Sequence, residues 1–292
     1  MTITNIIGGL GNQMFQYAAG KALSLEHGTR LRLDITGFET YGLHQGFELQ
    51  RVFNCTTEIA SVGDIQNVLG WQSSPLVKRV MAKPRLAAFR SKAFVVEPHF
   101  HYWPEINSLQ NDCYLLGYWQ SEQYFAHIAH KIREDFTFKQ PMSKKNTEFA
   151  KQINLVNAVS LHVRRGDYAN NPKTTATHGL CSLEYYQKAI ECIAGLVQQP
   201  YFYIFSDDIA WVKCNINMDF PHEYIDYNHG TESYNDMRLM SICKHNIIAN
   251  SSFSWWGAWL NSNIEKIVIA PKHWFAREVN TVDLIPRGWL IK

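Results

Sequence analysis

Short apolar runs alternate with helix-like stretches through the second half of the chain, and this alternation constrains the fold more than any other feature. The runs cover 158–163, 201–206, 223–227, 246–250 and 266–270. Between the first two, apolar residues such as Tyr186, Ile190 and Ile193 recur at helical spacing and predict a helix over 182–199. Regular alternation of strands and helices is typical of a parallel, doubly wound sheet, so we expect an α/β fold.

The start of the chain has the same order of elements. An apolar run over 2–7 predicts a strand, and a glycine-containing loop over 8–13 follows it. A helix is predicted from Met14 to a stop at Gly28, and the next strand is predicted over 29–35.

The region that follows has no clear periodicity as far as residue 150. Its aromatic patches at 100–103 and 114–119 could stack on sugar rings or fill a core. We therefore expect two α/β units, 1–150 and 151–292, with the polar segment 139–145 close to their boundary.

Two adjacent arginines, Arg164 and Arg165, stand where a predicted buried strand ends. A charge in that position is costly unless it meets a partner, and a diphosphate suits the planar guanidinium fork well. Ligands of open α/β sheets bind beyond the carboxyl ends of the strands, which is where this pair lies. The alternative is an internal salt bridge, which for Arg165 could involve Asp167 or the Asp207-Asp208 pair.

His162 lies two residues before Arg164, so both side chains should point to one face of the strand, with Arg165 opposite. This spacing suits a single pocket in which His162 contacts a base and Arg164 contacts a phosphate. The alternative for His162 is a core histidine whose polar atoms are satisfied by the protein.

Two later segments hold further candidates. Asp236 stands near the start of a predicted helix, where the helix dipole favours an acid in any case. Ser251, Ser252 and Phe253 lie between a predicted strand and a tryptophan-rich helix. Serine hydroxyls and free N–H groups at a helix N-terminus bind anions or cap the helix, and the two roles can coexist. The core, rather than a sugar platform, is the expected place of the tryptophans of that helix, Trp255, Trp256 and Trp259.

The loop over 8–13 imitates a dinucleotide-binding fingerprint, because its glycines follow a strand and Asp34 lies 23 residues beyond Gly11. Met14 stands where that fingerprint has its third glycine, which allows the helix to pack closely on the strand. Asn12 and Gln13 offer two side-chain amides instead.

Three segments, taken in order, resemble the α-1,2-fucosyltransferases of glycosyltransferase family 11. They are Gly-Gly-Leu-Gly-Asn-Gln-Met-Phe-Gln-Tyr at 8–17, His-Val-Arg-Arg-Gly-Asp-Tyr at 162–168, and the stretch from Asn235 to Trp259. The second contains the HxRRxD pattern that α-1,6- and protein O-fucosyltransferases share, and the likeness extends to about Trp274. It implies the GT-B architecture, in which two Rossmann-like units face each other across a cleft. The unit over 1–150 would then be the acceptor side, and the unit over 151–292 would bind GDP-fucose.

The resemblance also implies roles for individual residues. His162 would line the guanine pocket, Arg164 would contact the β-phosphate, and Asp236 would accept hydrogen bonds from guanine N1–H and N2–H₂. Asn12 would approach the fucose and its phosphate. The expected catalytic residues are Arg164, Asn12 and Asp167, and the expected donor-binding residues are His162, Arg164, Arg165, Asp236, Ser251, Ser252, Phe253, Gly11 and Gln13.

The implied reaction is inverting transfer of L-fucose from GDP-β-L-fucose to the 2-hydroxyl of a terminal galactose, in O-antigen-type polysaccharide synthesis. The leaving diphosphate gains charge that must be stabilised. The sequence has no DxD motif and no Cys/His cluster, so we expect no metal and no cofactor; Arg164, Ser252 and helix-terminal N–H groups would replace the metal. No acid lies between 168 and 183, so either Asp167 is the base or departure of the leaving group drives the reaction.

The bulk properties exclude several classes of protein. A formal charge of +2 is too small to indicate a nucleic-acid partner. No stretch approaches the roughly 20 apolar residues that cross a bilayer, and no basic leader precedes the first strand. The six cysteines form no CxxC pair, which suits reduced thiols. We therefore expect a cytoplasmic enzyme, and the resemblance implies one of bacterial type, because animal members of that family carry a membrane anchor.

One segment, 71–94, indicates a peripheral membrane contact. No acid lies between Asp64 and Glu97, whereas six basic residues are interleaved with apolar ones. The basic residues are Lys78, Arg79, Lys83, Arg85, Arg90 and Lys92. Such a patch is attracted to anionic lipid and would suit an acceptor that is a lipid-linked, galactose-terminated oligosaccharide. Pro84 argues against one continuous amphipathic helix, and a solvated surface helix is the alternative.

Two other functions fit part of the sequence. A Rossmann oxidoreductase acting on nucleotide sugars would use the glycine-containing loop, although Met14 counts against it. A non-catalytic glycan-binding protein would use the many aromatic residues, but it leaves Arg164 and Arg165 without a role.

Overall fold

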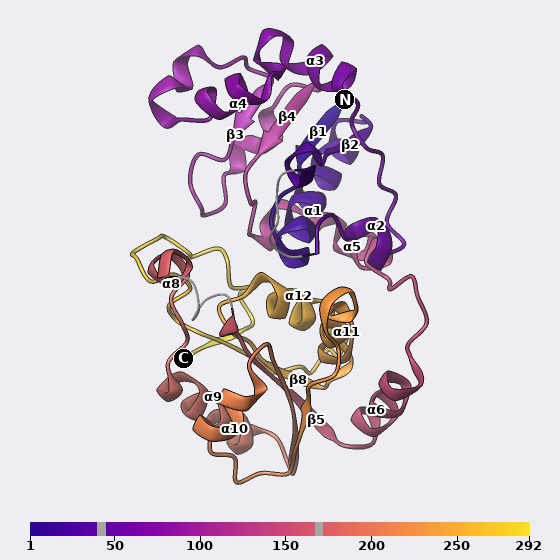
Figure 1. Cartoon of the computed structure of the whole chain (residues 1–292), viewed down its shortest axis with the longest axis vertical. Coiled ribbons are helices and arrows are strands. Elements are labelled where there is room, and N and C mark those ends of the chain that lie inside the picture. Colours follow the sequence, from indigo (N-terminus) through magenta and orange to yellow (C-terminus); the bar gives the residue numbers. More distant parts are fainter. Residues whose placement is uncertain (40–44, 167–171) are drawn as a thin grey trace. The chain divides into compact units, whose positions relative to one another are not determined.

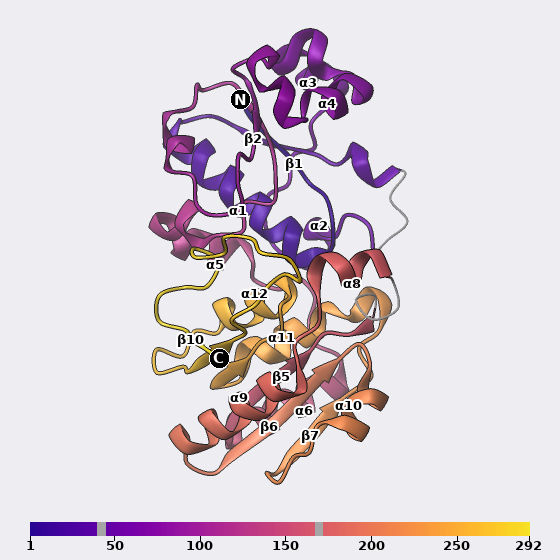
Figure 2. The same ribbon diagram turned by 90° about the vertical axis from the view of Figure 1, so that its left-hand side faces the viewer.

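A computed structural model describes residues 1–39, 45–166 and 172–292, which form two compact units (Figures 1 and 2). Unit 1 comprises Met1–Lys139 and Asn280–Leu284, and unit 2 comprises Gln140–Val279 and Ile285–Lys292. The chain thus enters unit 2 within the polar segment 139–145. Residue 150, where the sequence analysis set the limit, lies inside helix α6 (Lys144–Leu155) of unit 2.

Unit 1 is built on a four-stranded parallel sheet in the order β2-β1-β4-β3. Its strands are β1 (Thr2–Asn5), β2 (Leu31–Asp34), β3 (Phe94–Val96) and β4 (Cys113–Leu116). Its α-helices are α1 (Leu10–Glu26), α2 (Leu49–Val52), α3 (Val62–Leu69), α4 (Pro75–Met81) and α5 (Ala129–Asp135). Its 3-10 helices are η1 (Thr36–Glu39), η2 (Gly70–Ser73), η3 (Pro84–Phe89), η4 (Pro104–Ser108), η5 (Glu122–Tyr124) and η6 (Ala126–Ile128). Strands β3 and β4 lie in the region that the sequence left without assignment.

Helix α1 begins four residues earlier than expected, at Leu10, so the predicted loop over 8–13 is corrected to Gly8 and Gly9 alone. Gly8 makes the turn with a φ of +80°, a conformation that favours glycine. Close packing of α1 on β1 depends on Gly20, because a β-carbon there would collide with the hydroxyl of Thr4. Gly20 therefore does the work that a dinucleotide fingerprint assigns to its third glycine.

Unit 2 is built on a six-stranded parallel sheet in the order β10-β9-β8-β5-β6-β7. Its strands are β5 (Asn157–Val163), β6 (Pro200–Ser206), β7 (His222–Ile225), β8 (His245–Ile247), β9 (Val268–Ala270) and β10 (Leu290–Ile291). Besides α6, its helices are α8 (Pro172–His178), α9 (Leu183–Leu196), α10 (Ile209–Asn215), η7 (Gly230–Glu232), α11 (Tyr234–Ile242) and α12 (Ser252–Leu260). The predicted α/β class with a parallel sheet is confirmed.

Alternate residues of β5 enter different cores. Val159 and Leu161 pack with α9 and α10 on one face of the sheet. Ala158 packs with α6 and α11 on the other face (Figure 1). Helices therefore cover both faces, which is why β5 reads as a mostly apolar run. The prediction that the tryptophans of α12 belong to the core is also confirmed, because Trp255, Trp256 and Trp259 are all buried.

Candidate functional site

Three neighbouring strands of unit 2 end at one edge of the sheet. Val163 of β5 pairs with Ser206 of β6, and Leu161 of β5 pairs with Ile247 of β8. Polar residues follow each of these strand ends, at the edge where α/β sheets bind ligands. A surface hollow lined by Val156, Gln198–Tyr201 and Pro221 lies near the opposite, amino-terminal ends of β5 and β6, so it is a separate feature.

Arg164 and Asp207 meet where β5 and β6 end. Arg164 Nη1 lies 2.8 Å from Asp207 Oδ2, and Asp207 Oδ1 accepts a hydrogen bond of 2.8 Å from the backbone N–H of Arg165. A β-carbon at Gly166 would lie only 2.6 Å from Asp207 Oδ2, so this close approach requires glycine. The internal salt bridge considered for the arginine pair is therefore present. This salt bridge is compatible with ligand binding by Arg164, because a guanidinium has five N–H donors in a planar fork.

Arg165 is a structural residue. Its guanidinium lies 3.7 Å from the centre of the Trp211 ring, and its Nε lies 3.7 Å from Asp208 Oδ2. Asp208 in turn caps α10 by accepting a hydrogen bond from the N–H of Trp211. These contacts hold Arg165 against α10 and support the structural alternative, while its place among the donor-binding residues stays a prediction.

His162 is buried, and its ring centre lies 5.9 Å from that of Phe253. Burial lowers the pKa of His162 to about 4, so the imidazole is neutral near pH 7. Among the residues that the structure describes, none hydrogen-bonds its buried Nδ1. A satisfied core histidine would have that atom paired, so the placement favours a binding role.

Asp236 is the third residue of α11, so the helix-dipole explanation for an acid there applies. Its Oδ1 accepts a hydrogen bond of 2.8 Å from Asn228, whose own amide is held by Asn146. Burial raises the pKa of Asp236 to about 7. Within the described ranges no cation forms an ion pair with it. A half-buried carboxylate held by a neutral amide is costly, so a helix-capping role alone does not account for it.

The N-terminus of α12 begins with Ser251, whose Oγ accepts a hydrogen bond of 3.3 Å from the N–H of Phe253. The capping role considered for this segment is thus present. Ser252 and Phe253 are half-buried at the first two positions of the helix. The side-chain amide of Asn250 donates to three backbone carbonyls and thereby fixes the residue that precedes Ser251.

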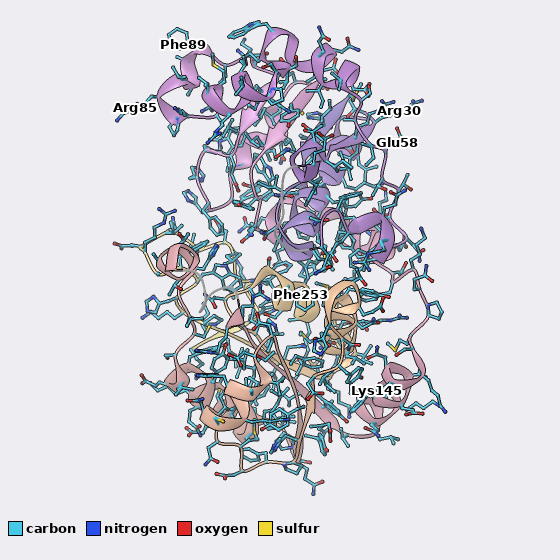
Figure 3. The ribbon with its side chains drawn as sticks, in the orientation of Figure 1. Arg30, Glu58, Arg85, Phe89, Lys145 and Phe253 are labelled. Carbon is cyan, nitrogen blue, oxygen red and sulfur yellow. The ribbon has the colours of Figure 1, made fainter. Side chains whose placement is uncertain are left out.

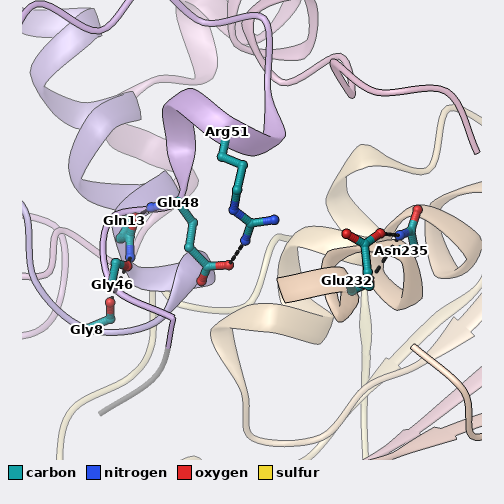
Figure 4. A network of polar contacts seen from close by, with 7 residues as sticks. All are labelled: Gly8, Gln13, Gly46, Glu48, Arg51, Glu232 and Asn235. Carbon is teal, nitrogen blue, oxygen red and sulfur yellow. Dashed lines mark hydrogen bonds and ion pairs between the residues drawn. The ribbon is translucent and has the colours of Figure 1, made fainter. Parts of the chain in front are cut away.

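In unit 1, Asn12 and Gln13 lie on the first turn of α1 and have different environments. Gln13 is fully buried, and its Nε2 donates to the carbonyls of Gly8 and Gly46 at 2.9 and 2.8 Å. Its Oε1 accepts from the N–H of Glu48 at 2.9 Å (Figure 4). This arrangement gives the amide of Gln13 a role in the fold, while its expected role in donor binding stays a prediction. Gly11 is buried in the same turn.

Asn12 is half-buried, and its Oδ1 accepts a hydrogen bond of 2.7 Å from Gln120 Nε2. The segment 117–120, which follows β4, presents Gln120 through an unusual backbone conformation. Trp119 is fully buried and has a φ of +56°. The carboxylate of Glu97 holds this conformation by accepting from the N–H groups of Tyr118 and Trp119 at 2.7 and 2.9 Å. Burial raises the pKa of Glu97 to about 7.

Sequence reasoning missed Glu97 and Gln120. The aromatic patch at 114–119 was the only signal near them, and it fits a sugar platform or a core equally well. Trp119 is a core residue, and the backbone conformation of the segment places the amide of Gln120 in contact with Asn12.

Asp34 does not behave as the acid of a dinucleotide fingerprint. It is fully buried, forms an ion pair of 2.8 Å with Lys78, and accepts hydrogen bonds from Thr36 and Tyr114. Although burial opposes ionisation, hydrogen bonds from Lys78, Thr36 and Tyr114 lower the pKa of Asp34. These partners occupy the carboxylate of Asp34, so it cannot bind a ribose. The oxidoreductase interpretation therefore loses the acid on which it depends.

Asp167, the candidate base, lies outside the described residues. Among those that are described, no three His, Cys, Asp or Glu side chains gather as they would around a metal ion. In the same part of the chain, no helix is long and apolar enough to cross a membrane.

Comparison with known proteins adds relatives of similar length. The model of glycosyl transferase family 11 matches residues 88–290. An α-1,2-colitosyltransferase of Escherichia coli is 38% identical over 293 residues, covering 99% of this chain and 98% of the relative. The O-antigen biosynthesis glycosyltransferase WbnK of Escherichia coli is 34% identical, covering 97% of each chain.

A solved structure of the α-1,6-fucosyltransferase NodZ, soaked with GDP-fucose, aligns with a TM-score of 0.54 and 13% identity. The alignment covers 89% of this chain and 91% of NodZ. A likeness at this identity concerns the fold alone, and it agrees with the GT-B-like class of two Rossmann-like units that was expected.

Proposed function

Because the chain belongs to glycosyl transferase family 11, we propose that it is an inverting galactoside 2-α-L-fucosyltransferase with GDP-β-L-fucose as donor. The solved relative that was soaked with GDP-fucose supports this choice of donor. The name of WbnK supports a role in O-antigen-type polysaccharide synthesis, for which the acceptor would be a galactose-terminated oligosaccharide in the cytoplasm.

The observation that carries the proposal is the half-buried carboxylate of Asp236, for which the described residues provide no cation. Its described hydrogen bond comes from the neutral amide of Asn228 and uses Oδ1. Guanine presents two adjacent donors, N1–H and N2–H₂, which match the two oxygens of a carboxylate. Adenine would set a ring nitrogen acceptor against the same oxygens. Asp236 therefore accounts for the choice of a guanine nucleotide, with His162 and Phe253 lining the base.

The chemistry follows from where charge develops. The bond between the anomeric carbon and the β-phosphate oxygen breaks through an oxocarbenium-like transition state, while the acceptor hydroxyl forms a bond on the opposite face. The departing GDP takes the electron pair of the broken bond. Arg164 stabilises the resulting charge, together with Ser252 and the N–H groups at the start of α12. The hydroxyl proton passes to Asp167 or, where departure of GDP drives the reaction, to solvent.

Asn12 of unit 1 is the residue that the family resemblance places near the fucose and its phosphate. Its Oδ1 accepts a hydrogen bond of 2.7 Å from Gln120 Nε2, which fixes the orientation of the amide. An N–H donor suits the sugar hydroxyls and the phosphate oxygens of the donor substrate.

Colitosyl transfer is a second candidate, because the relative that is 38% identical carries that name. Colitose is L-fucose without its 3-hydroxyl group, so the two donors differ by one hydrogen-bonding group. A site built to bind that hydroxyl rejects the deoxy sugar strongly, whereas the reverse discrimination is weaker.

The deciding experiment measures GDP release from GDP-fucose and from GDP-colitose, with a panel of galactose-terminated acceptors, followed by linkage analysis of the product. We expect a higher kcat/KM with GDP-fucose and an α-1,2 linkage to galactose. A preference for GDP-colitose would transfer the assignment to the second candidate. An absence of acceptor-dependent GDP release with both donors would favour a non-catalytic glycan-binding protein.

A further inference from the structure

We propose that the part of unit 1 formed by η2, α4 and η3 is a membrane-contact surface that binds anionic phospholipids. We call it the η2–η3 surface, and its exposed residues are Trp71, Leu76, Arg79, Val80, Lys83, Arg85, Phe89 and Lys92. The inference does not depend on which sugar is transferred.

Large apolar side chains are strongly exposed on this surface. Leu76 is 77% exposed, Trp71 is 68% exposed and Phe89 is 67% exposed, although each could bury more than a hundred square ångströms (on the order of 150–250 Å² for the aromatics). Single exposed apolar residues need no explanation, but a group of them within 20 residues indicates a binding surface.

The two exposed aromatic residues are held together by a buried glutamine. Gln72 Nε2 donates to the carbonyl of Phe89 at 2.9 Å, and Gln72 Oε1 accepts from the N–H of Ser91 at 3.0 Å. Gln72 directly follows Trp71. Its two hydrogen bonds therefore hold the backbone next to Trp71 against the backbone of Phe89 and Ser91. The exposure of Trp71 and Phe89 is therefore built into the fold.

Internal contacts also fix the orientation of α4. Lys78 reaches inward to Asp34 at 2.8 Å, and Met81 packs against the core of unit 1. Helical spacing then turns Leu76, Arg79 and Val80 outward. In Figure 3, Arg85 and Phe89 project from the same end of unit 1.

Two of the six basic residues in the segment serve the fold, which corrects the sequence-based interpretation. Lys78 is paired with Asp34, and Arg90 donates from Nε to the carbonyl of Met81 at 2.7 Å. Arg90 also donates to the carbonyls of Ala82 and Lys83 and thereby fixes the turn between α4 and η3. The four exposed bases that remain are Arg79, Lys83, Arg85 and Lys92.

The charge pattern selects anionic lipid over a second copy of the chain. Four exposed bases with no acid between Asp64 and Glu97 would repel the same surface of another copy in a twofold contact. An anionic bilayer satisfies both kinds of residue, because its phosphates attract the bases while the interface takes up Trp71, Leu76 and Phe89.

Co-sedimentation of the full chain with vesicles tests the proposal. The vesicles contain either phosphatidylcholine alone or phosphatidylcholine with phosphatidylglycerol, at about 50 mM and about 300 mM salt. We expect binding to the anionic vesicles at low salt and a marked loss at higher salt. Each neutralised base should weaken binding about fivefold. The quadruple variant Arg79→Gln, Lys83→Gln, Arg85→Gln, Lys92→Gln should therefore not sediment, and Trp71→Ser with Phe89→Ser should weaken binding at both salt concentrations.

Matched controls separate a local surface from general stickiness. Four exposed bases of unit 2 are changed in Lys144→Gln, Lys151→Gln, Lys272→Gln, Arg277→Gln. Two exposed apolar residues of unit 2 are changed in Ile264→Ser and Leu196→Ser. Both controls should sediment like the wild type, and all variants should keep its Tm.

Three results would overturn the proposal. The first is equal recovery with neutral and anionic vesicles, and the second is an equal loss of binding in the unit 2 controls. The third is concentration-dependent dimerisation in sedimentation velocity that Trp71→Ser with Phe89→Ser abolishes, because it would assign the surface to a second copy.

Discussion

In the proposed site, the single side chain of Arg164 would contact both Asp207 and a ligand, which the guanidinium fork makes possible. We expect Arg164→Lys to reduce kcat by more than tenfold in a folded protein. Lysine keeps the charge but cannot hold the Asp207 carboxylate and two phosphate oxygens in fixed directions. One such contact in a transition state contributes about 2–4 kcal/mol, and a tenfold change in rate corresponds to about 1.4 kcal/mol.

Steady-state kinetics with a thermal melt measures both consequences. Arg165→Lys is the matched control, because the structure gives Arg165 a stacking contact with Trp211 instead of a ligand. The Arg165→Lys variant should lower the Tm and keep a kcat close to that of the wild type. If Arg164→Lys retains more than a tenth of the wild-type kcat, the salt bridge to Asp207 is its main role.

The ionisation of Asp236 should affect the stability of the fold as well as the proposed binding of GDP. Burial raises its pKa to about 7 from an ordinary value of 3.8. A carboxyl whose folded pKa is raised stabilises the protein fully below pH 4, and this contribution is lost as the pH rises to 7. Asp236→Asn cannot ionise, so it should raise the Tm more at pH 8 than at pH 5. The same change sets an NH₂ group against a guanine donor and should weaken GDP binding more than tenfold.

Melts at the two pH values and calorimetric titration with GDP test the two halves of this prediction. Glu232→Gln is the control, because Glu232 is exposed four residues before Asp236 and its carboxylate accepts a hydrogen bond from Asn235 (Figure 4). It should change neither quantity. An Asp236→Asn variant with unchanged GDP affinity would leave Asp236 as a helix-terminus acid.

At the scale of elements, the first turn of α1 and the segment after β4 are linked through the side chains of Asn12 and Gln120. Gln120 fixes the amide of Asn12 through a hydrogen bond of 2.7 Å. We expect Asn12→Ala and Gln120→Ala each to lower kcat/KM by about tenfold, as a net hydrogen bond of 0.5–1.5 kcal/mol implies (~2–12-fold) when it orients a reacting group. Because both changes remove the same contact, the double variant should be no worse than Asn12→Ala alone.

Gln123→Ala provides the comparison within the same unit. Gln123 loses a hydrogen bond of 2.7 Å to Asp283 in that variant, but it does not contact Asn12. Its kcat/KM should match the wild type. Fully additive losses for Asn12→Ala and Gln120→Ala would show that Gln120 does not act through Asn12.

The two sheets differ in how far the sequence predicts them. Strands β5 and β6 are seven residues long and buried on both faces, so each appears as an apolar run. Strands β3 and β4 have three and four residues, which is too short for a periodic signal. Helix α1 starts before the expected residue because Gly11, Asn12 and Gln13 look like a loop in sequence but gain partners from the folded unit.

The candidate site shows the same limit. His162, Arg164 and Asp236 could be proposed because strand ends and a resemblance placed them together. Strand alternation predicted that Arg164 and Arg165 point to opposite faces, and a pairing of Arg165 with the Asp207-Asp208 pair was one of the alternatives. The stacking of Arg165 on Trp211 could not be predicted, because Trp211 lies more than 40 residues away in sequence. Glu97 was out of reach for the same reason, since its role is to hold two backbone N–H groups 21 and 22 residues further along.

For the molecule as a whole, we expect catalysis without a divalent metal. Among the described residues, no group of three potential ligands could hold one, and Arg164 with the start of α12 can stabilise the leaving diphosphate instead. GDP release should continue in EDTA, with at most a modest gain from Mg²⁺ as it chelates the product. Complete loss in EDTA that Mn²⁺ restores would contradict the prediction.

The short return of Asn280–Leu284 to unit 1 has a consequence for biosynthesis. Asp283 accepts hydrogen bonds from Tyr102, Ser121 and Gln123, and Leu284 is buried. A ribosome delivers these five residues only after almost all of unit 2 has been translated. Unit 1 therefore cannot complete its fold while unit 2 is being synthesised. A nascent chain that stalls before residue 280 lacks the contacts that Asp283 and Leu284 make in unit 1.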